Sequence, residues 1–462
     1  MSLAELLAST GGELLGAGSG TFSFSTVQTD SRAVTAGGLF APLVGAFRDG
    51  HAYIQDAMDK GASAVLVSRG DGEIFALARK NPAVAFVRVA DTLRALQDAA
   101  EAYVAKFPGL MKVSVTGSSG KTTTKEILAS ILRQKYRVVS NEGNLNSETG
   151  LPLSVFAIRA GHELGLFEMG MNREGEMGEL SKVLKPNFAL VTNIGTAHIG
   201  RLGSRENIAR EKKRIFSYVD ERGVCAIPKD DDFADILAEG VRGKVVRYGL
   251  DADARISVLG DDGLLGTRFL LDGTEVRLAL PGKHNFLNAL GAIALSRELG
   301  LSAEHIKRGI ESLPALGGRS EVVRKGGFTV LKDCYNANPD SMEKALELSA
   351  SVAVPGKKIL VIGDMLELGS ESRSAHERAG EQALRARADC VVFLGDEMRA
   401  AFEKAAERNV GGAELLHVAG NGASAMEEAA RAVRAASGGG TGHFLLLKGS
   451  RGMGLERISE QL

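Results

Sequence analysis

The segment TGSSGKTT (116–123) combines glycines, hydroxyls and a lysine in an order that suits phosphate binding. An apolar stretch (111–115) precedes it and a helical pattern follows it, as in a phosphate-binding loop. Lys121 would reach the β- and γ-phosphates, and the Thr122 hydroxyl would bind Mg²⁺. The alternative is a flexible turn. The expected nucleotide contacts are Gly117, Ser118, Ser119, Gly120, Lys121, Thr122 and Thr123.

Two further polar residues follow apolar segments of the same region. Glu168 ends the segment 164–167, and His198 follows the segment 188–194. If both segments are strands of one parallel sheet, both side chains emerge beside the phosphate loop, where Mg²⁺ and the γ-phosphate need ligands. Taken singly, a carboxylate in a solvated loop and a capping or core histidine are the alternatives.

The elements that must position these residues form an alternating strand and helix pattern. We expect an α/β protein of three domains. A small α/β N-terminal domain (1–108) contains strand-like segments at 22–27, 38–44, 64–68 and 83–89. Its last helix, 91–106, stops at the Pro108 triplet FPG.

The central domain (109–316) is expected to hold a P-loop ATPase-type parallel sheet. An antiparallel excursion (245–280) follows, marked by hairpin turns at Asp262-Gly263 and Asp272-Gly273. The C-terminal domain (317–462) reads as Rossmann-like, with strands at 328–333, 358–362, 390–394 and 444–448. It lacks GxGxxG after its first strand, so a nicotinamide cofactor is not expected.

Composition restricts the function further. The chain has 462 residues, with 56 Lys+Arg against 57 Asp+Glu. The near-zero net charge gives no reason to expect nucleic acid or an acidic membrane as a partner. No run of eighteen apolar residues predicts a membrane span, and the N-terminus lacks the basic flank of a signal peptide. A cytoplasmic protein with reduced Cys225, Cys334 and Cys390 is therefore expected.

Several motifs in this order resemble the Mur ligase family, whose members build the peptide of bacterial cell-wall precursors. They are TGSSGKTTTKE (116–126), GNLN (143–146), EMG (168–170) and NIGTAH (193–198). Three later motifs are DCYNANPDSM (333–342), GDMLELG (363–369) and KGSR (448–451). The resemblance covers essentially the whole chain, and YNANP and GDMxELG discriminate most within the family.

The resemblance implies an ATP-dependent amide ligase. ATP would phosphorylate the terminal carboxylate of UDP-N-acetylmuramoyl-tripeptide. The amine of D-alanyl-D-alanine would attack the acyl phosphate and release phosphate, giving the pentapeptide precursor of peptidoglycan. The implied partners are these two substrates, with no nucleic acid and no membrane, and the implied state is a monomer.

The resemblance also implies two Mg²⁺ ions, held through Thr122, Glu168, His198 and Lys212. In the family, a lysine at the position of Lys212 is carbamylated, and its new carboxylate helps to hold the second ion. Lys212 lies in EKKR (211–214), and the residues alone instead favour a solvated basic face of a helix. Catalysis is assigned to Lys121, Lys212, His198 and Glu168.

The resemblance assigns the rest of the nucleotide site to two regions. His284 and Asn285, within GKHNFLN (282–288), would grip adenine, although alone they also fit a helix-capping turn. Arg319 would reach the γ-phosphate when the third domain closes. The remaining contacts are Asn288, Asp333, Tyr335, Asn336 and Asn338.

Substrate contacts are expected on the N-terminal and C-terminal domains, where the motifs at 29–32, 45–51 and 448–451 also fit ordinary turns. The UDP end would lie on the N-terminal domain, and a carboxylate of peptide or dipeptide on the C-terminal domain. Asp364 and Glu367, in a cleft-facing loop, would orient the incoming amine. The assigned residues are Ser31, Arg32, Phe47, Arg48, His51, Asn144, Asn146, Lys448, Ser450 and Arg451.

Three other functions remain open. Another amino acid ligase of this family, or a folylpolyglutamate synthetase, would keep the fold and change the substrate, but YNANP and GDMxELG argue against both. A P-loop nucleotide switch would lack ligase chemistry, but no NKxD-type guanine motif follows the loop. A UDP-sugar-binding module would leave Lys121 and Thr122 unexplained.

Overall fold

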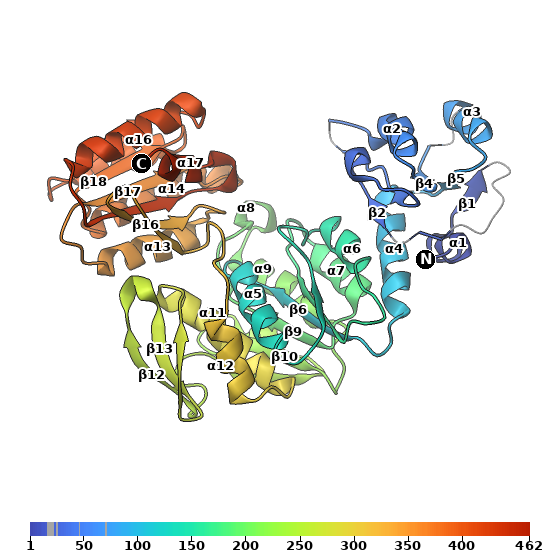
Figure 1. Cartoon of the computed structure of the whole chain (residues 1–462), viewed down its shortest axis with the longest axis horizontal. Coiled ribbons are helices and arrows are strands. Elements are labelled where there is room, and N and C mark those ends of the chain that lie inside the picture. The colour runs from blue at the N-terminus through green and yellow to red at the C-terminus, as the bar shows by residue number, and fades with distance from the viewer. Residues whose placement is uncertain (16–22, 25, 46, 70–71) are drawn as a thin grey trace.

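The computed structural model describes residues 1–15, 23–24, 26–45, 47–69 and 72–462, and it contains three α/β domains in series (Figure 1). The central domain lies between the other two. Residues 22 and 25 of one expected strand, and residue 46 between the expected substrate contacts, lie outside the described residues. No helix in the described ranges is long and apolar enough to cross a membrane.

The N-terminal sheet has the strand order β1-β5-β4-β3-β2, in which β1 pairs antiparallel with β5 and the other neighbours pair in parallel. Its strands are β1 (Glu13–Leu15), β2 (Val27–Gln28), β3 (Leu39–Phe40), β4 (Ala64–Val67) and β5 (Ala85–Arg88). Its helices include α1 (Leu3–Thr10), α2 (Ile54–Asp59) and α3 (Gly72–Lys80). The strands at β2 and β3 are therefore much shorter than the sequence predicted.

Helix α4 (Thr92–Ala105) attaches this domain to the central one. Asp91 caps its start by accepting a hydrogen bond from the Arg94 N–H, and the helix ends just before Pro108. One face, including Leu96 and Tyr103, is buried against the helices of both domains. Tyr103 Oη also donates to the Ile158 carbonyl over 2.9 Å, so the packed face carries a polar link.

The central sheet is parallel throughout, in the order β11-β10-β9-β6-β8-β7. Its strands are β6 (Met111–Thr116), β7 (Val138–Ser140), β8 (Leu164–Glu168), β9 (Phe188–Val191), β10 (Val224–Pro228) and β11 (Lys244–Tyr248). Separate apolar clusters cover its two faces, which confirms the prediction from the continuous apolar runs.

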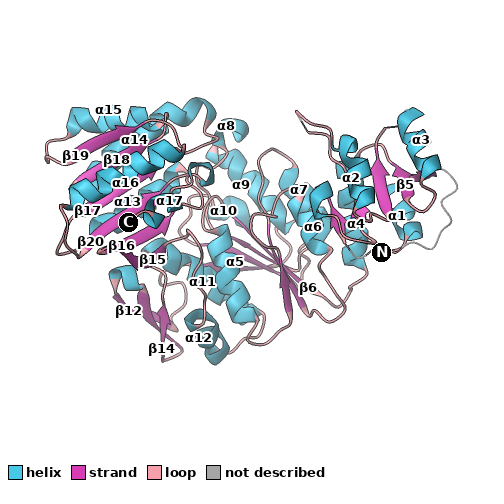
Figure 2. Ribbon diagram, turned by 45° about the horizontal axis from the view of Figure 1, so that its top comes forward, coloured by secondary structure: helices cyan, strands magenta, loops and turns pink. Residues whose placement is uncertain are grey.

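Helices α5, α11 and α12 cover one face of this sheet, and α6, α7, α9 and α10 lie on the other (Figures 1 and 2). Their bounds are α5 (Lys121–Leu132), α6 (Gly150–Val155), α7 (Glu176–Leu184), α8 (Ile199–Leu202), α9 (Arg205–Lys213), α10 (Ala234–Ala238), α11 (Lys283–Glu298) and α12 (Ala303–Glu311).

The predicted antiparallel excursion (245–280) contains a three-stranded sheet of β12 (Ile256–Asp261), β13 (Thr267–Leu271) and β14 (Thr274–Leu278). Its start was predicted wrongly, because 244–248 form β11, which pairs in parallel with β10 in the central sheet. Asp272 and Gly273 both have positive φ, which suits the tight two-residue turn between β13 and β14. The other predicted hairpin turn, at Asp262-Gly263, is a short 3₁₀ turn that Asp262 precedes.

The C-terminal sheet has the order β15-β16-β20-β17-β18-β19, with β15 as an antiparallel edge on an otherwise parallel sheet. Its strands are β15 (Glu321–Lys325), β16 (Phe328–Asp333), β17 (Lys358–Gly363), β18 (Cys390–Leu394), β19 (Glu414–Val418) and β20 (His443–Lys448). Its helices are α13 (Pro339–Ser351), α14 (Ser372–Arg385), α15 (Met398–Arg408), α16 (Ala423–Ser437) and α17 (Glu456–Glu460). Helices α13–α15 cover one face, and α16 and α17 the other (Figure 2).

Candidate active site

A cavity of about 510 Å³ lies between the central and C-terminal domains, where strands β6, β8, β9, β16 and β20 end. Ligands of open α/β sheets bind at this edge. The cavity brings together most of the residues that the sequence assigned to nucleotide and metal. Those that line it are Ser118, Ser119, Gly120, Lys121, Thr122, Thr123, Glu168, His198, His284, Asn285, Asn288, Arg319, Asp333, Tyr335, Asn336 and Asn338.

The phosphate loop connects β6 to α5 and is held by its neighbours. Gly117 has φ +152°, and a Cβ there would lie 1.8 Å from Thr192 Oγ1. Gly120 has φ +77°, and a Cβ there would lie 2.4 Å from Asn288 Oδ1. The Ser118 N–H donates to the Asn193 carbonyl. Glycine at both positions is therefore required by the loop's conformation and by its close contacts.

Lys121 extends back along the loop. Its Nζ donates to the Gly117 carbonyl at 2.9 Å, and the Ser118 carbonyl lies 3.5 Å away. Burial lowers the pKa of Lys121, and the charge of Arg319 adds to this effect while Glu168 opposes it. No carboxylate forms an ion pair with this ammonium among the residues that the structure describes, so its charge is available to a phosphate.

Thr122 and Glu168 meet where β8 ends. Thr122 Oγ1 donates to Glu168 Oε2 at 2.6 Å, and Asn146 Nδ2 donates to Oε1 at 2.5 Å. Asn141 fixes the backbone of Glu168, since its Oδ1 accepts from the Glu168 N–H. A hydroxyl and a carboxylate are hard oxygen donors, so this pair fits the chemistry of Mg²⁺.

His198 lines the same cavity, on the segment after β9. Its φ is +66°, a left-handed conformation that fixes where the ring leaves the backbone. Burial, with the charges of Lys121 and Lys212, lowers the pKa of His198 to about 3. The imidazole is therefore neutral at neutral pH and has a lone pair for a metal.

Lys212 is 1% exposed, so the solvated basic face that the residues alone favoured is wrong. Its helix, α9, buries Ile208 and Lys212 on one face while Arg210 points to solvent. Burial and the charge of Lys121 hold the pKa of Lys212 well below its ordinary value. No ion pair to Lys212 occurs within the described ranges, and a neutral amine is the form that reacts with CO₂.

The first turn of α11 also lines the cavity. Asn285 Nδ2 donates to the Pro281 carbonyl and to Ser320 Oγ, which links this turn to the start of the C-terminal domain. Burial lowers the pKa of His284 to about 4, so its ring is neutral. His284 and Asn285 lie inside helix α11, which begins at Lys283. The alternative prediction, that they form a capping turn before a helix starting at residue 288, is therefore wrong.

Two arginines stack on one tyrosine at the C-terminal wall. The Arg319 guanidinium lies 3.9 Å from the centre of the Tyr335 ring, and that of Arg451 lies 5.6 Å from it. Arg451 also pairs with Glu456 at 3.0 Å. The ring therefore holds guanidinium groups from two separate loops beside the cavity.

Asp333 and Lys448 form an ion pair beside this stack. Lys448 Nζ donates to Asp333 Oδ2 at 2.7 Å and to the Asn336 carbonyl at 3.0 Å. Burial alone would raise the pKa of Asp333, but Lys448 and the Ser320 N–H outweigh it and hold the pKa below its ordinary value. Lys448, which was expected to bind a carboxylate of the substrate, therefore already pairs with the carboxylate of Asp333.

The loop after β17 corrects one prediction. Asp364 does not line the cavity; it is 7% exposed, and its carboxylate accepts from the Met398 N–H at the start of α15. Glu367 does line the cavity. Ser450 Oγ accepts from the Leu366 N–H, so Ser450 supports this loop from the neighbouring strand end.

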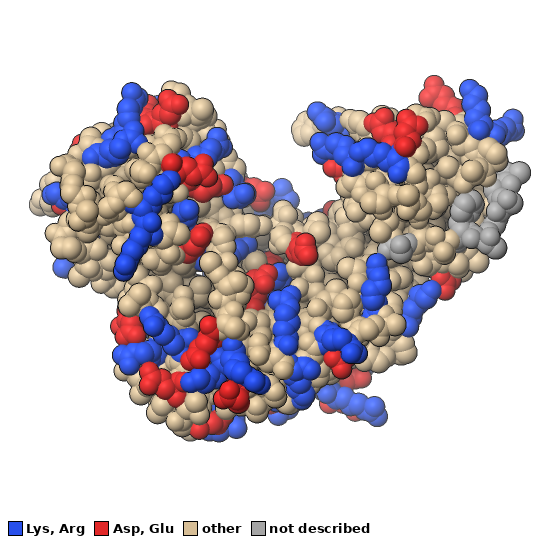
Figure 3. All heavy atoms as spheres, in the orientation of Figure 1, with Lys and Arg blue, Asp and Glu red and all other residues tan. Residues whose placement is uncertain are grey.

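The expected N-terminal substrate residues do not line the cavity. A deep hollow separates the N-terminal domain from the C-terminal domain (Figure 3). Phe47 is fully exposed and Arg48 is exposed, whereas Arg32 pairs with Asp30. His51 is buried, with Asp49 on one ring nitrogen and the Ser68 N–H on the other. Ser31 is also buried, in a 3₁₀ turn.

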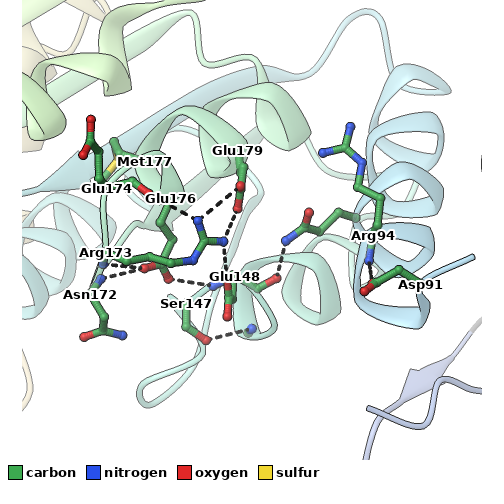
Figure 4. Close-up of polar contacts among 12 residues, drawn as sticks. Asp91, Arg94, Ser147, Glu148, Asn172, Arg173, Glu174, Glu176, Met177 and Glu179 are labelled. Atoms are coloured by element: carbon green, nitrogen blue, oxygen red, sulfur yellow. Dashed lines mark hydrogen bonds and ion pairs between the residues drawn. The ribbon is translucent and has the colours of Figure 1, made fainter. Parts of the chain in front are cut away.

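A buried carboxylate joins two loops next to the cavity (Figure 4). Glu176 accepts from the backbone N–H groups of Glu148, Asn172 and Arg173. Arg173 in turn lies between the carboxylates of Glu148 and Glu179, each 2.6 Å away. Since Asn172 lines the cavity and Glu148 follows the loop of Asn144 and Asn146, this network fixes the cavity's edge.

Sequence reasoning assigned no role to several residues that line the cavity: Ser147, Met171, Asn172, Thr192, Asn193, Ser320, Lys344 and Leu366. Asn193 carried a usable signal, since it opens the NIGTAH motif at the end of β9. Lys344 lies five residues after the NANP motif, and nothing in its local sequence marks it.

Comparison with known proteins identifies the family. Residues 23–104 match the model of the Mur ligase family catalytic domain, 115–296 that of the Mur ligase middle domain and 318–451 that of the glutamate ligase domain. A UDP-N-acetylmuramoyl-tripeptide–D-alanyl-D-alanine ligase of Treponema pallidum is 43% identical over 465 residues, covering 100% of this chain and 99% of that one.

Two solved structures are similar along the chain. Crystal structure I of MurF from Acinetobacter baumannii has a TM-score of 0.87 at 29% identity and covers 100% of this chain and 98% of that one. MurF ligase from Thermotoga maritima in complex with ADP has a TM-score of 0.78 at 27% identity, covering 94% and 96%. The chain therefore belongs to the Mur ligase family.

Proposed function

We propose that this chain uses ATP to join D-alanyl-D-alanine to UDP-N-acetylmuramoyl-tripeptide. The observation that carries the proposal is the shared cavity, in which a phosphate loop faces the Arg319 and Arg451 guanidinium groups of the next domain. The printed names of the Treponema pallidum relative and of the Acinetobacter baumannii structure support the same reaction.

The reaction needs an activated carboxylate, because a carboxylate ion is a poor electrophile. A carboxylate oxygen of the tripeptide attacks the γ-phosphorus of ATP, the bond to the β-phosphate oxygen breaks, and ADP leaves. The dipeptide amine then attacks the acyl carbon, the carbon–oxygen bond to phosphate breaks, and the amine loses a proton. Phosphoryl transfer depends on positioning and charge neutralisation, which Lys121 and Arg319 would supply from the two domains that line the cavity.

Residues of the central domain would hold Mg²⁺. Thr122 and Glu168 fit one ion, and His198 with a carbamylated Lys212 fits a second, since the amine of Lys212 is buried and its pKa is low. Bound Mg²⁺ would neutralise negative charge on the transferring phosphoryl group. Asn146 fixes Glu168 in position for this role.

Each domain would bind a different substrate. Residues 1–108 would bind the UDP end through Ser31, Arg32, Phe47 and Arg48, with His51 holding that loop. Residues 109–316 would bind ATP, and Asn144 and Asn146 would border the tripeptide. Residues 317–462 would receive the dipeptide, with its carboxylate on Arg451 and with Ser450 and Lys448 supporting that site. We further propose a cytoplasmic monomer.

Product formation tests the proposal. Purified protein is incubated with Mg²⁺-ATP and the UDP-tripeptide and D-alanyl-D-alanine, together and singly, while ADP and the pentapeptide are measured. ADP release that requires both substrates, with one pentapeptide per ADP, supports the ligase. Release with a single amino acid in place of the dipeptide would overturn the proposed acceptor, and release that needs neither substrate would indicate a nucleotide switch.

A further inference from the structure

Helix α13 of the C-terminal domain docks onto the central domain through one carboxylate. Asp340 Oδ2 accepts from the Thr196 N–H at 2.7 Å and from Thr196 Oγ1 at 3.1 Å. The fit is close, because a Cβ on Gly195 would lie 2.1 Å from Asp340 Oδ2. Asp340 is in the first turn of α13, where the helix dipole favours a negative charge.

The same face of α13 brings a lysine to the phosphate loop. Lys344 lies four residues after Asp340, so both side chains project from one side of the helix. Lys344 Nζ lies 3.4 Å from Ser119 Oγ and lines the cavity with Ser119 and Lys121. The ammonium therefore stands beside the loop that surrounds phosphate, although it comes from another domain.

Lys344 is half-buried, and among the described residues no carboxylate forms an ion pair with it. The charges of nearby carboxylates, Asp340, Glu347, Glu343 and Asp231, nevertheless act on it. Lys448, on the same wall, pairs with Asp333, and Lys125, on α5, pairs with Glu126. A partly buried cation that faces a cavity without a carboxylate partner is placed to receive an anion.

We propose that Lys344 binds the phosphate chain of the nucleotide, and that Asp340 is the positioning residue that brings Lys344 there. The inference rests on the proposed use of ATP and adds a second lysine to the phosphate site. Because this lysine belongs to the C-terminal domain, the full phosphate site exists only while that domain is docked.

Calorimetric titration with the ATP analogue AMP-PNP, in the presence of Mg²⁺, and separately with adenosine tests the proposal. Lys344→Met is expected to weaken AMP-PNP binding about tenfold or more, because a charged contact to phosphate is lost. Adenosine binding should be unchanged, which also shows that the variant is folded. Lys344→Arg should retain most of the affinity, and Lys404→Met, which removes a lysine on α15 away from the cavity, should bind like the wild type.

The positioning role of Asp340 has its own readout. Asp340→Ala is expected to weaken AMP-PNP binding severalfold, and Asp340→Ala combined with Lys344→Met should bind no more weakly than Lys344→Met alone. Additive losses would overturn the role of Asp340. The role of Lys344 would be overturned if Lys344→Met bound AMP-PNP like the wild type. It would also be overturned if the variant lost affinity for AMP-PNP and for adenosine by the same factor. Wild-type protein that binds no AMP-PNP would instead contradict the proposed function.

Discussion

Asp333 and Lys448 are direct neighbours on the parallel strands β16 and β20, and their side chains form an ion pair at the strand ends. The Lys448 side chain is 2% exposed and that of Asp333 is 19% exposed. The pair joins the wall of the cavity to the middle of the C-terminal sheet, so its loss would affect both stability and the site.

Lys448→Met is therefore expected to destabilise the protein, because Asp333 would remain buried without its cation. The loss should lie toward the lower end of roughly 3–5 kcal/mol, since water reaches part of Asp333. Thermal unfolding measures it. Asp333→Leu combined with Lys448→Met should recover part of the loss. A double variant that is less stable than Lys448→Met would show that the unpaired Asp333 is not what destabilises the single variant.

Lys121→Met is expected to lower kcat by about 10²–10³-fold while the protein stays folded, because a charge that faces the transferring phosphate is removed. Steady-state ADP release measures the effect. Lys135→Met, an exposed lysine just beyond the end of α5, is the matched control and should have wild-type turnover. Wild-type kcat in Lys121→Met would exclude the phosphate loop from the chemistry.

Lys212→Ala is expected to be nearly inactive if a carbamylated Lys212 holds a metal. Short carboxylic acids such as acetate should then restore part of the activity, because they can replace the missing carboxylate in the space left by the side chain. The measurement is kcat with and without added acid. Full activity of Lys212→Ala without any acid would show that this buried lysine takes no part in the reaction.

The low pKa of His284 predicts a pH dependence of stability. Its imidazole has a pKa of about 4 when folded, against 6.5 as the ordinary value. Between these values the unfolded state binds more protons than the folded state, so stability falls as the pH decreases from about 6.5 to 4. His284→Gln should show a smaller decrease in melting temperature over this range, and an equal decrease would contradict the assignment.

The sequence predicted most of the inner strands of the central and C-terminal sheets, but it missed β7, β10, β15 and β19 and placed most of β11 in the antiparallel excursion. The expected strands at 328–333 and 390–394 have the same bounds as β16 and β18, because continuous apolar runs between polar turns describe strands that are buried on both faces. The N-terminal strands were predicted less well. At β2 and β3 only two residues each pair with neighbours, and the apolar residues around them pack in loops.

The lining of the cavity could be predicted where a single short motif supplies it, as at residues 118–123. It was not predictable where distant segments meet. Nothing in EKKR shows that Lys212 faces inward while Arg210 does not, because that depends on which side of α9 meets the sheet. Lys344 reaches the phosphate loop only through the docking of α13, a contact between residues more than two hundred positions apart.

In the proposed reaction the tripeptide carboxylate is activated as an acyl phosphate in the cavity between the central and C-terminal domains. The direct measurement uses UDP-N-acetylmuramoyl-tripeptide in which both oxygens of the terminal carboxylate are ¹⁸O. With Mg²⁺-ATP and D-alanyl-D-alanine, one ¹⁸O atom should appear in each released phosphate, because the carboxylate oxygen that attacks phosphorus leaves with it. Phosphate without ¹⁸O, released as the pentapeptide forms, would rule out an acyl phosphate intermediate.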